Sequence, residues 1–115
     1  MVIKDAQAID MREGTVSFWI PQHSVQFDDA TVRHLFDAAA PDGELTVVIN
    51  AANRLTVFHA YGPTGVTRAE WDVSHLDPGA RHMVAVTWSL ASQELILYVD
   101  GQQVATARMA RLPSP

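Results

Sequence analysis

Short runs of alternating apolar and polar residues, separated by turn signals, dominate this chain. In GTVSFWI at 14–20, Val16, Phe18 and Ile20 share one face of an extended strand. In ELILYVD at 94–100, Leu95, Leu97 and Val99 do the same. Further β-like runs are VRHLFD at 32–37, ELTVVIN at 44–50, RLTVFHAY at 54–61, VTRAEWDV at 66–73, HMVAVTWS at 82–89 and QQVATARM at 102–109. The pattern therefore predicts an all-β chain without a long helix.

Turn residues separate these runs. Asp100-Gly101 lies between two alternating runs and predicts a hairpin with a type I′ turn, because both central residues of that turn need a positive φ. AAAPDG at 38–43 is predicted to be a turn, AAN at 51–53 another, and Asp77-Pro78-Gly79 a third. Residues 1–13 show no clear period: Val2-Ile3 could open an edge strand and Ala6–Met11 a helical turn. Frequent turns between short strands indicate an antiparallel sandwich or barrel.

The alternation also predicts which faces are buried. We assign Val84, Val86 and Trp88 to the core, together with the apolar faces of the two runs above. The opposite faces carry Trp19 in one run and Ile96 with Tyr98 in the other. Outward aromatic rings can stack on a flat ligand such as a pyranose, and they are equally typical of protein interfaces. The position of Trp71 stays open.

Length and charge narrow the functional classes. A chain of 115 residues predicts one domain over 1–115, with 1–13 and 110–115 at its periphery. The net charge of −5, with 8 Lys and Arg and no basic cluster, argues against a nucleic-acid partner. No cysteine is present, so disulfides and cysteine metal sites are excluded. We find neither a signal peptide nor an apolar run long enough to span a membrane, and expect no membrane partner.

Three segments carry a family resemblance. RHMVAVTW at 81–88 followed by LILYVDGQQVA at 95–105 resembles the strand and hairpin signature of laminin-G-like domains in the concanavalin A-like lectin/glucanase superfamily. TVSFWIP at 15–21 is similar to an earlier strand of that family, so the resemblance covers about 12–108. It implies a jelly-roll β-sandwich, here of minimal length, and a carbohydrate ligand. By itself it suggests an extracellular protein.

The sequence departs from the family pattern at two points. Arg81 stands where the family usually has Trp, and the sequence ends at Pro115, before the usual closing strand. An uncovered sheet edge is a template for pairing with another chain. We therefore expect a homo-oligomer formed by symmetric edge pairing or sheet stacking.

Catalytic patterns are sparse. Some relatives in this superfamily are glucanases that use carboxylates spaced by two on one strand, but here the only such alternation is Glu70 and Asp72. No Gly-x-Ser-x-Gly elbow accompanies the serines. We predict that the protein is not an enzyme.

Metal ligands are also scattered. The five histidines, at 23, 34, 59, 75 and 82, lack the spacing of two ligands on one helical face, although His34 and His59 could meet across strands. The loop pair Asp28-Asp29 could supply Ca²⁺ ligands together with Asp42, Asn50 or Asn53, but nothing in the sequence brings them together. We predict no metal and no cofactor.

Two functions remain in competition. The first is a non-enzymatic binding module for a glycan or protein ligand, with Trp19, Ile96, Tyr98, His34 and His59 as its ligand or interface residues. The second is a self-assembling subunit that buries the outer sheet face between copies, an alternative favoured by the apolar side chain of Ile96. A small glycan-active hydrolase is the third and least supported class.

Overall fold

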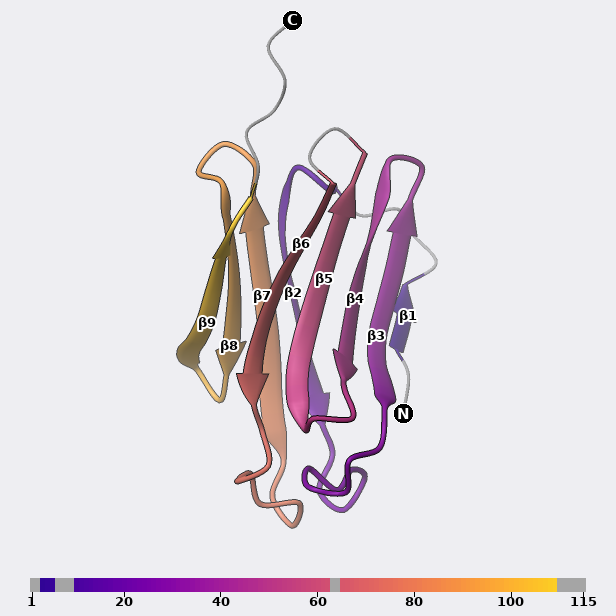
Figure 1. Cartoon of the computed structure of the whole chain (residues 1–115), viewed down its shortest axis with the longest axis vertical. Coiled ribbons are helices and arrows are strands. Elements are labelled where there is room, and N and C mark those ends of the chain that lie inside the picture. Colours follow the sequence, from indigo (N-terminus) through magenta and orange to yellow (C-terminus); the bar gives the residue numbers. More distant parts are fainter. Residues whose placement is uncertain (1–2, 6–9, 63–64, 110–115) are drawn as a thin grey trace, which may run out of the picture.

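The chain folds into two facing β-sheets (Figure 1). The structure is a computed structural model that describes the backbone of residues 3–5 and residues 10–62 and 65–109 in full. One sheet has five strands in the order β1-β3-β4-β5-β6, and the other has four in the order β2-β7-β8-β9. The strands span Ile3–Asp5 (β1), Glu13–Ile20 (β2), Arg33–Ala40 (β3), Gly43–Ile49 (β4), Arg54–Tyr61 (β5), Gly65–Asp72 (β6), His82–Ser89 (β7), Glu94–Val99 (β8) and Gln102–Arg108 (β9).

Neighbouring strands are antiparallel except at one edge, where β1 pairs parallel to β3. The all-β sandwich expected from the alternating pattern is confirmed. The predicted type I′ signal is confirmed as well, because Asp100 and Gly101 have φ values of 53° and 82°. This turn leaves β8 and β9 side by side as a hairpin.

The prediction for AAAPDG was wrong in its extent. Strand β3 continues through all three alanines, and Ala40 pairs with Gly43 across the two turn residues Pro41 and Asp42. Alanine has a low strand propensity, but pairing with β4 and burial of Ala38 override it. The pattern of β3 is also interrupted: the register shifts between His34 and Phe36, so that Leu35 and Phe36 are both buried.

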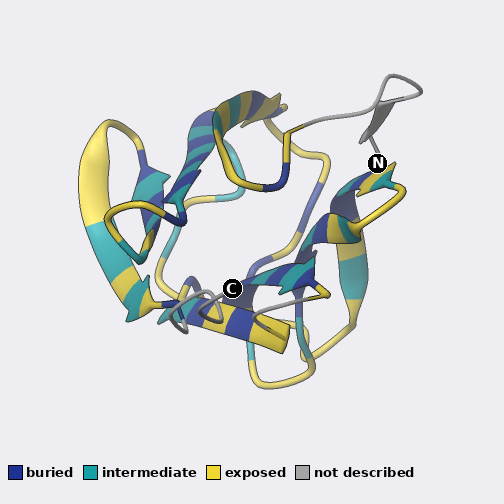
Figure 2. Ribbon diagram, turned by 90° about the horizontal axis from the view of Figure 1, so that it is seen from above, coloured by how far each residue is buried: buried dark blue, intermediate teal, exposed yellow. Residues whose placement is uncertain are grey.

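The core lies between the sheets, and buried and exposed residues alternate along the strands (Figure 2). The predicted inner faces of β2, β7 and β8 are confirmed, with Val16 only partly buried. Phe18 of β2 stacks on Phe36 of β3 with ring centroids 5.8 Å apart, which joins the two layers. The loop residues Val25 and Phe27 also enter the core, although their segment lacks a clear alternating pattern.

The N-terminal segment takes part in this core. Met11 is 1% exposed, and the carbonyl of Asp10 accepts a hydrogen bond from the indole N–H of Trp88 at 2.8 Å. The edge strand considered at Val2-Ile3 corresponds to β1 from Ile3 onward. The helical turn considered at Ala6–Met11 falls mostly on 6–9, outside the described residues, as does the tail at 110–115.

Candidate functional site

The outer face of the four-stranded sheet presents side chains in rows. Across β2, β7, β8 and β9, the register aligns Ser17, Ala85, Tyr98 and Gln103. The next row consists of Thr15, Thr87, Ile96 and Thr106, and the one after it of Glu13, Ser89, Glu94 and Arg108. The face is therefore mostly hydroxyls, amides and charges around two larger apolar side chains.

A polar hollow of about 360 Å³ opens on the β8–β9 side of this face. It is lined by Gln93, Glu94, Gln103, Thr106, Ala107 and Arg108. Arg108 donates to the side-chain oxygen of Gln93 at 3.4 Å, and the Gln93 amide donates to the carbonyl of Met109 at 3.1 Å. The wall thus presents carboxylate acceptors, guanidinium donors, and amide and hydroxyl groups that can do both.

Tyr98 lies beside this hollow. It is paired with Gln103 across the β8–β9 ladder, and its ring is half-buried on the outer face. A register shift between Leu97 and Tyr98 places an extra residue in β9 at this point. Such a bulge bends the strand, and bulges commonly re-aim side chains next to binding sites.

Trp19 lies on the same face, two strands away from β8. Its side chain is 49% exposed, and the guanidinium of Arg81 lies 4.6 Å from the ring centroid. This cation–π contact holds the ring and covers part of one of its faces. Arg81, which stands where the family pattern has Trp, thus packs against the ring of Trp19.

Ile96 is half-buried between threonines. Its direct neighbours in the ladder are Thr87 of β7 and Thr106 of β9. Threonine carries both a methyl and a hydroxyl group, so these neighbours form a mixed surface around the isoleucine. Ile96 is therefore part of a polar surface and not of a broad apolar patch.

The two predicted histidines do not meet. His34 lies in β3 opposite Val48 of β4 and is exposed. His59 is 0% exposed on the core side of β5, where one ring nitrogen, Nε2, lies 2.7 Å from the carbonyl oxygen of Met11. Its ring lies against Trp88, with centroids 6.2 Å apart. His59 therefore packs the core, and the two histidines do not form a shared site.

In the acidic loop pair Asp28-Asp29, the carboxylate of Asp29 bonds to residues close to it in the chain. Asp29 forms an ion pair with Arg33 and accepts a hydrogen bond from the backbone N–H of Thr31, and its hydrogen bond to Arg33 lowers the pKa of Asp29. Asp28 is exposed. Within residues 10–62 and 65–109, no three His, Cys, Asp or Glu side chains are placed to hold a metal ion.

The carboxylates of β6 are also engaged locally. Glu70 accepts from Arg54 at 3.2 Å, and Asp72 accepts from the hydroxyl and backbone N–H of Ser74. Neither lines a hollow found on the described residues. Trp71, whose position the pattern left open, is half-buried with its ring edge-on to His75.

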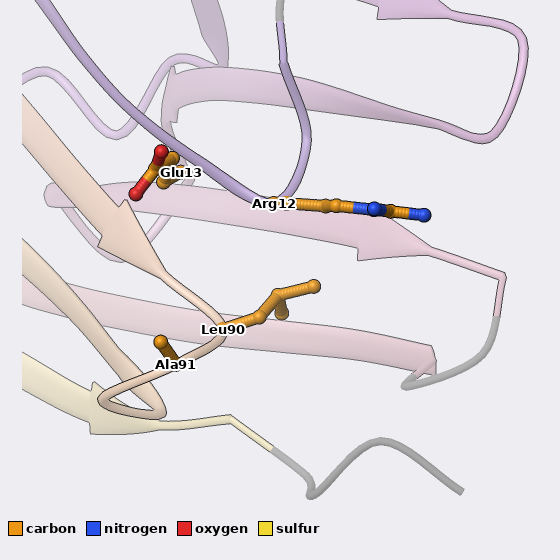
Figure 3. Close-up of a pocket in the computed structure, with 4 residues that line it drawn as sticks. All are labelled: Arg12, Glu13, Leu90 and Ala91. Atoms are coloured by element: carbon orange, nitrogen blue, oxygen red, sulfur yellow. The ribbon is translucent and has the colours of Figure 1, made fainter. Parts of the chain in front are cut away.

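A second hollow, of about 430 Å³, lies where β2 begins, near the turn that follows β7. It is lined by Arg12, Glu13, Leu90 and Ala91, and Figure 3 shows Arg12 and Glu13 pointing apart. Arg12 donates to the hydroxyl of Tyr61 at 3.4 Å, and this bond raises the pKa of the guanidinium. The hollow has few polar groups that are free to orient a ligand.

His82 and Asp100 form an ion pair that the sequence did not reveal. The ring Nδ1 lies 2.7 Å from Oδ2 of Asp100, and Nε2 lies 2.8 Å from the carbonyl oxygen of Asp77. Burial opposes the charge on His82, but these two hydrogen bonds outweigh it and raise the pKa of His82. The family-like HMVAVTW and YVDG segments contain both residues, but only their pairing across the β7–β8 ladder brings them together.

A family model described as the concanavalin A-like lectin/glucanases superfamily matches residues 2–115. The chain belongs to this superfamily. No curated protein and no solved structure gives a significant match to it. Membership in the concanavalin A-like lectin/glucanases superfamily confirms the resemblance carried by residues 81–88, 95–105 and 15–21.

Superfamily membership supports a lectin-like or binding module in general. The name covers both lectins and glucanases, so the choice between binding and catalysis depends on this chain's own surface. No described segment forms a helix long and apolar enough to cross a membrane.

Proposed function

We propose that the protein is a non-enzymatic lectin-like module that binds a glycan in the polar hollow on the β8–β9 hairpin. The observation that supports this most directly is the lining of the hollow, in which Glu94, Gln103 and Arg108 offer both acceptors and donors. A sugar presents many hydroxyl groups, and each both donates and accepts hydrogen bonds. A lining that offers both donors and acceptors therefore suits a sugar better than an apolar lining would.

Tyr98 supplies the second element of this proposal. A pyranose ring has an apolar face as well as hydroxyl edges, and an aromatic ring beside the polar wall can contact that face. Tyr98 is paired directly with Gln103 of the hollow. The mostly small and polar side chains on the rest of the outer face leave room for further sugar units toward Trp19.

The absence of catalysis is part of the proposal. Glycoside hydrolysis needs two carboxyl groups flanking one bond, about 5–10 Å apart. The lining of the hollow contains one carboxylate, that of Glu94. Glu70 and Asp72 lie on the other sheet and are bonded to Arg54 and Ser74.

Titration with a panel of neutral oligosaccharides tests the proposal. A glycan that binds the wild type should bind Tyr98→Ala and Gln103→Ala at least tenfold more weakly. The matched control is Phe58→Ala, because Phe58 is a half-buried aromatic on the outer face of the five-stranded sheet, and it should bind like the wild type. Equal weakening in all three variants, or binding that Tyr98→Ala leaves unchanged, contradicts the assignment.

Self-association through the same face is the second candidate. It is favoured by the 49% exposure of Trp19 and by the half-buried Ile96 and Tyr98 nearby. If this face is an oligomer interface, light scattering should show an oligomer that Tyr98→Asp shifts toward monomer. A strictly monomeric wild type at high concentration rules this candidate out and leaves the face free for a ligand.

A further inference from the structure

Three separate parts of the chain meet at the ring of His82. The ring is 7% exposed at the start of β7 and lies between the turn that joins β8 to β9 and the loop between β6 and β7. The turn contributes the carboxylate of Asp100, and the loop contributes the carbonyl oxygen of Asp77. From the loop between β2 and β3, the ring of Phe27 lies edge-on at 5.5 Å between centroids.

Both partners of the ring nitrogens accept hydrogen bonds only. A backbone carbonyl cannot donate, and an ionised carboxylate cannot donate either. Both nitrogens of His82 must therefore carry hydrogen to satisfy this geometry, so the ring is an imidazolium. In either neutral tautomer, one nitrogen lone pair would face an oxygen lone pair at less than 3 Å.

Among the surrounding charged groups, the carboxylate of Asp77 adds to the effect of Asp100 and further raises the pKa of His82. The carboxylate of Asp77 accepts from the backbone N–H of Gly79 at 2.8 Å, and only its carbonyl oxygen bonds the ring. The neighbouring Arg81 directs its guanidinium onto Trp19. The loop between β2 and β3 carries His23, whose backbone N–H donates to the carbonyl of Pro78 and so ties that loop to the same assembly.

Asp100 is also the tip of the hairpin that carries the proposed glycan hollow. Its second carboxylate oxygen accepts from the backbone N–H of Met83 at 2.9 Å, so one side chain holds both His82 and the end of β7. Tyr98 and Gln103 flank the turn on its two strands. Asp100 therefore connects His82 to Tyr98, which lies beside the hollow, and to Gln103, which lines it.

We propose that the His82–Asp100 pair is a pH-sensitive latch that holds the β8–β9 hairpin in its binding geometry while His82 is protonated, and that loosens when His82 becomes neutral and one of its two ring hydrogen bonds is lost. The effect on a glycan rests on the proposed function, whereas the latch itself does not. Because the pKa of His82 is raised above its ordinary value of about 6.5, the latch is complete below that pH. It is lost as the pH rises through the higher, folded-state value.

Hydrogen exchange and NMR titration test the latch without a ligand. Between pH 6 and pH 9, the protection factors of the Met83 and Asp100 amides should fall severalfold, because the hydrogen bonds that hold this turn weaken when His82 loses its proton. In His82→Gln, those protection factors should already be low at pH 6 and should not change with pH. His34→Gln, which replaces an exposed strand histidine, should behave like the wild type.

The wild-type titration keeps the test valid if His82→Gln does not fold. Protection factors that stay constant in the wild type, or an NMR titration midpoint of His82 at or below about 6.5, overturn the latch. The glycan effect is tested with cellohexaose, laminarihexaose and mannohexaose, of which any binder should bind more weakly at pH 9 than at pH 6. If none binds while the protection factors fall, the glycan proposal fails and the latch stands. If one binds equally at both values, the coupling is refuted.

Discussion

Gly14 contacts Trp88, and this contact should decide whether Gly14→Ala stabilises or destabilises the fold. Gly14 pairs with Trp88 across β2 and β7, and a Cβ added to Gly14 would lie 2.6 Å from Cζ2 of the indole. Overpacking of this kind costs about 1–3 kcal/mol. Replacing a strand glycine with alanine recovers about 0.5–1 kcal/mol of chain entropy. Gly14→Ala should therefore lower the free energy of unfolding by about 1–2 kcal/mol.

Trp88→Phe removes the ring atoms against which the new methyl group would clash. It also removes the indole N–H that donates to the Asp10 carbonyl at 2.8 Å, a bond of about 1 kcal/mol, and leaves a cavity. In that background, Gly14→Ala should raise the free energy of unfolding by about 0.5 kcal/mol, giving a coupling of about 2 kcal/mol. Urea unfolding of the wild type, the two single variants and the double variant measures this coupling energy. Additive effects of the two substitutions would refute the packing argument.

Gly43→Ala should prevent stable folding, because the added Cβ would lie 2.0 Å from a backbone oxygen of β5. In the control Gly62→Ala, the nearest atom to the added Cβ is 3.9 Å away. Circular dichroism should therefore show a normal fold for Gly62→Ala and not for Gly43→Ala. The pKa of Asp100 is lowered, because its bonds to His82 and Met83 outweigh burial, and that of His82 is raised. The loss of unfolding free energy in Asp100→Ala should therefore be largest between about pH 4 and 6.5 and shrink on both sides, as chemical denaturation across pH can show. Acrylamide quenching should fall sharply in Trp19→Phe, because Trp19 is the most exposed tryptophan.

The sequence predicts the fold well where alternation is regular. The faces of β2, β7 and β8 and the positive φ values at Asp100-Gly101 follow directly from residue type and spacing. Prediction failed where tertiary contacts override local preference. The alanines before Pro41 form a strand because β4 pairs with them, and the extra residue in β3 breaks the alternation between His34 and Phe36.

The candidate site was only partly visible in the sequence. Alternation places Trp19, Ile96 and Tyr98 on one outer face, and the structure agrees. Gln103 and Arg108 are missed because their relation to Tyr98 depends on the register of β9, which a bulge shifts. Its polar side chain suggests a surface site for His59, but the hydrogen bond between its ring and the Met11 carbonyl allows it to lie in the core. No local pattern signals a contact between residues 48 positions apart.

Glycan binding on the outer face of the β8–β9 hairpin is the proposed function. NMR spectra of labelled protein, recorded during titration with a bound oligosaccharide, test it most directly. If the glycan binds there, the amide shifts of Glu94, Tyr98, Gln103 and Arg108 should change first and most, with smaller changes toward Trp19. Shifts centred on the outer face of the five-stranded sheet, or on the hollow between Arg12 and Leu90, would contradict it.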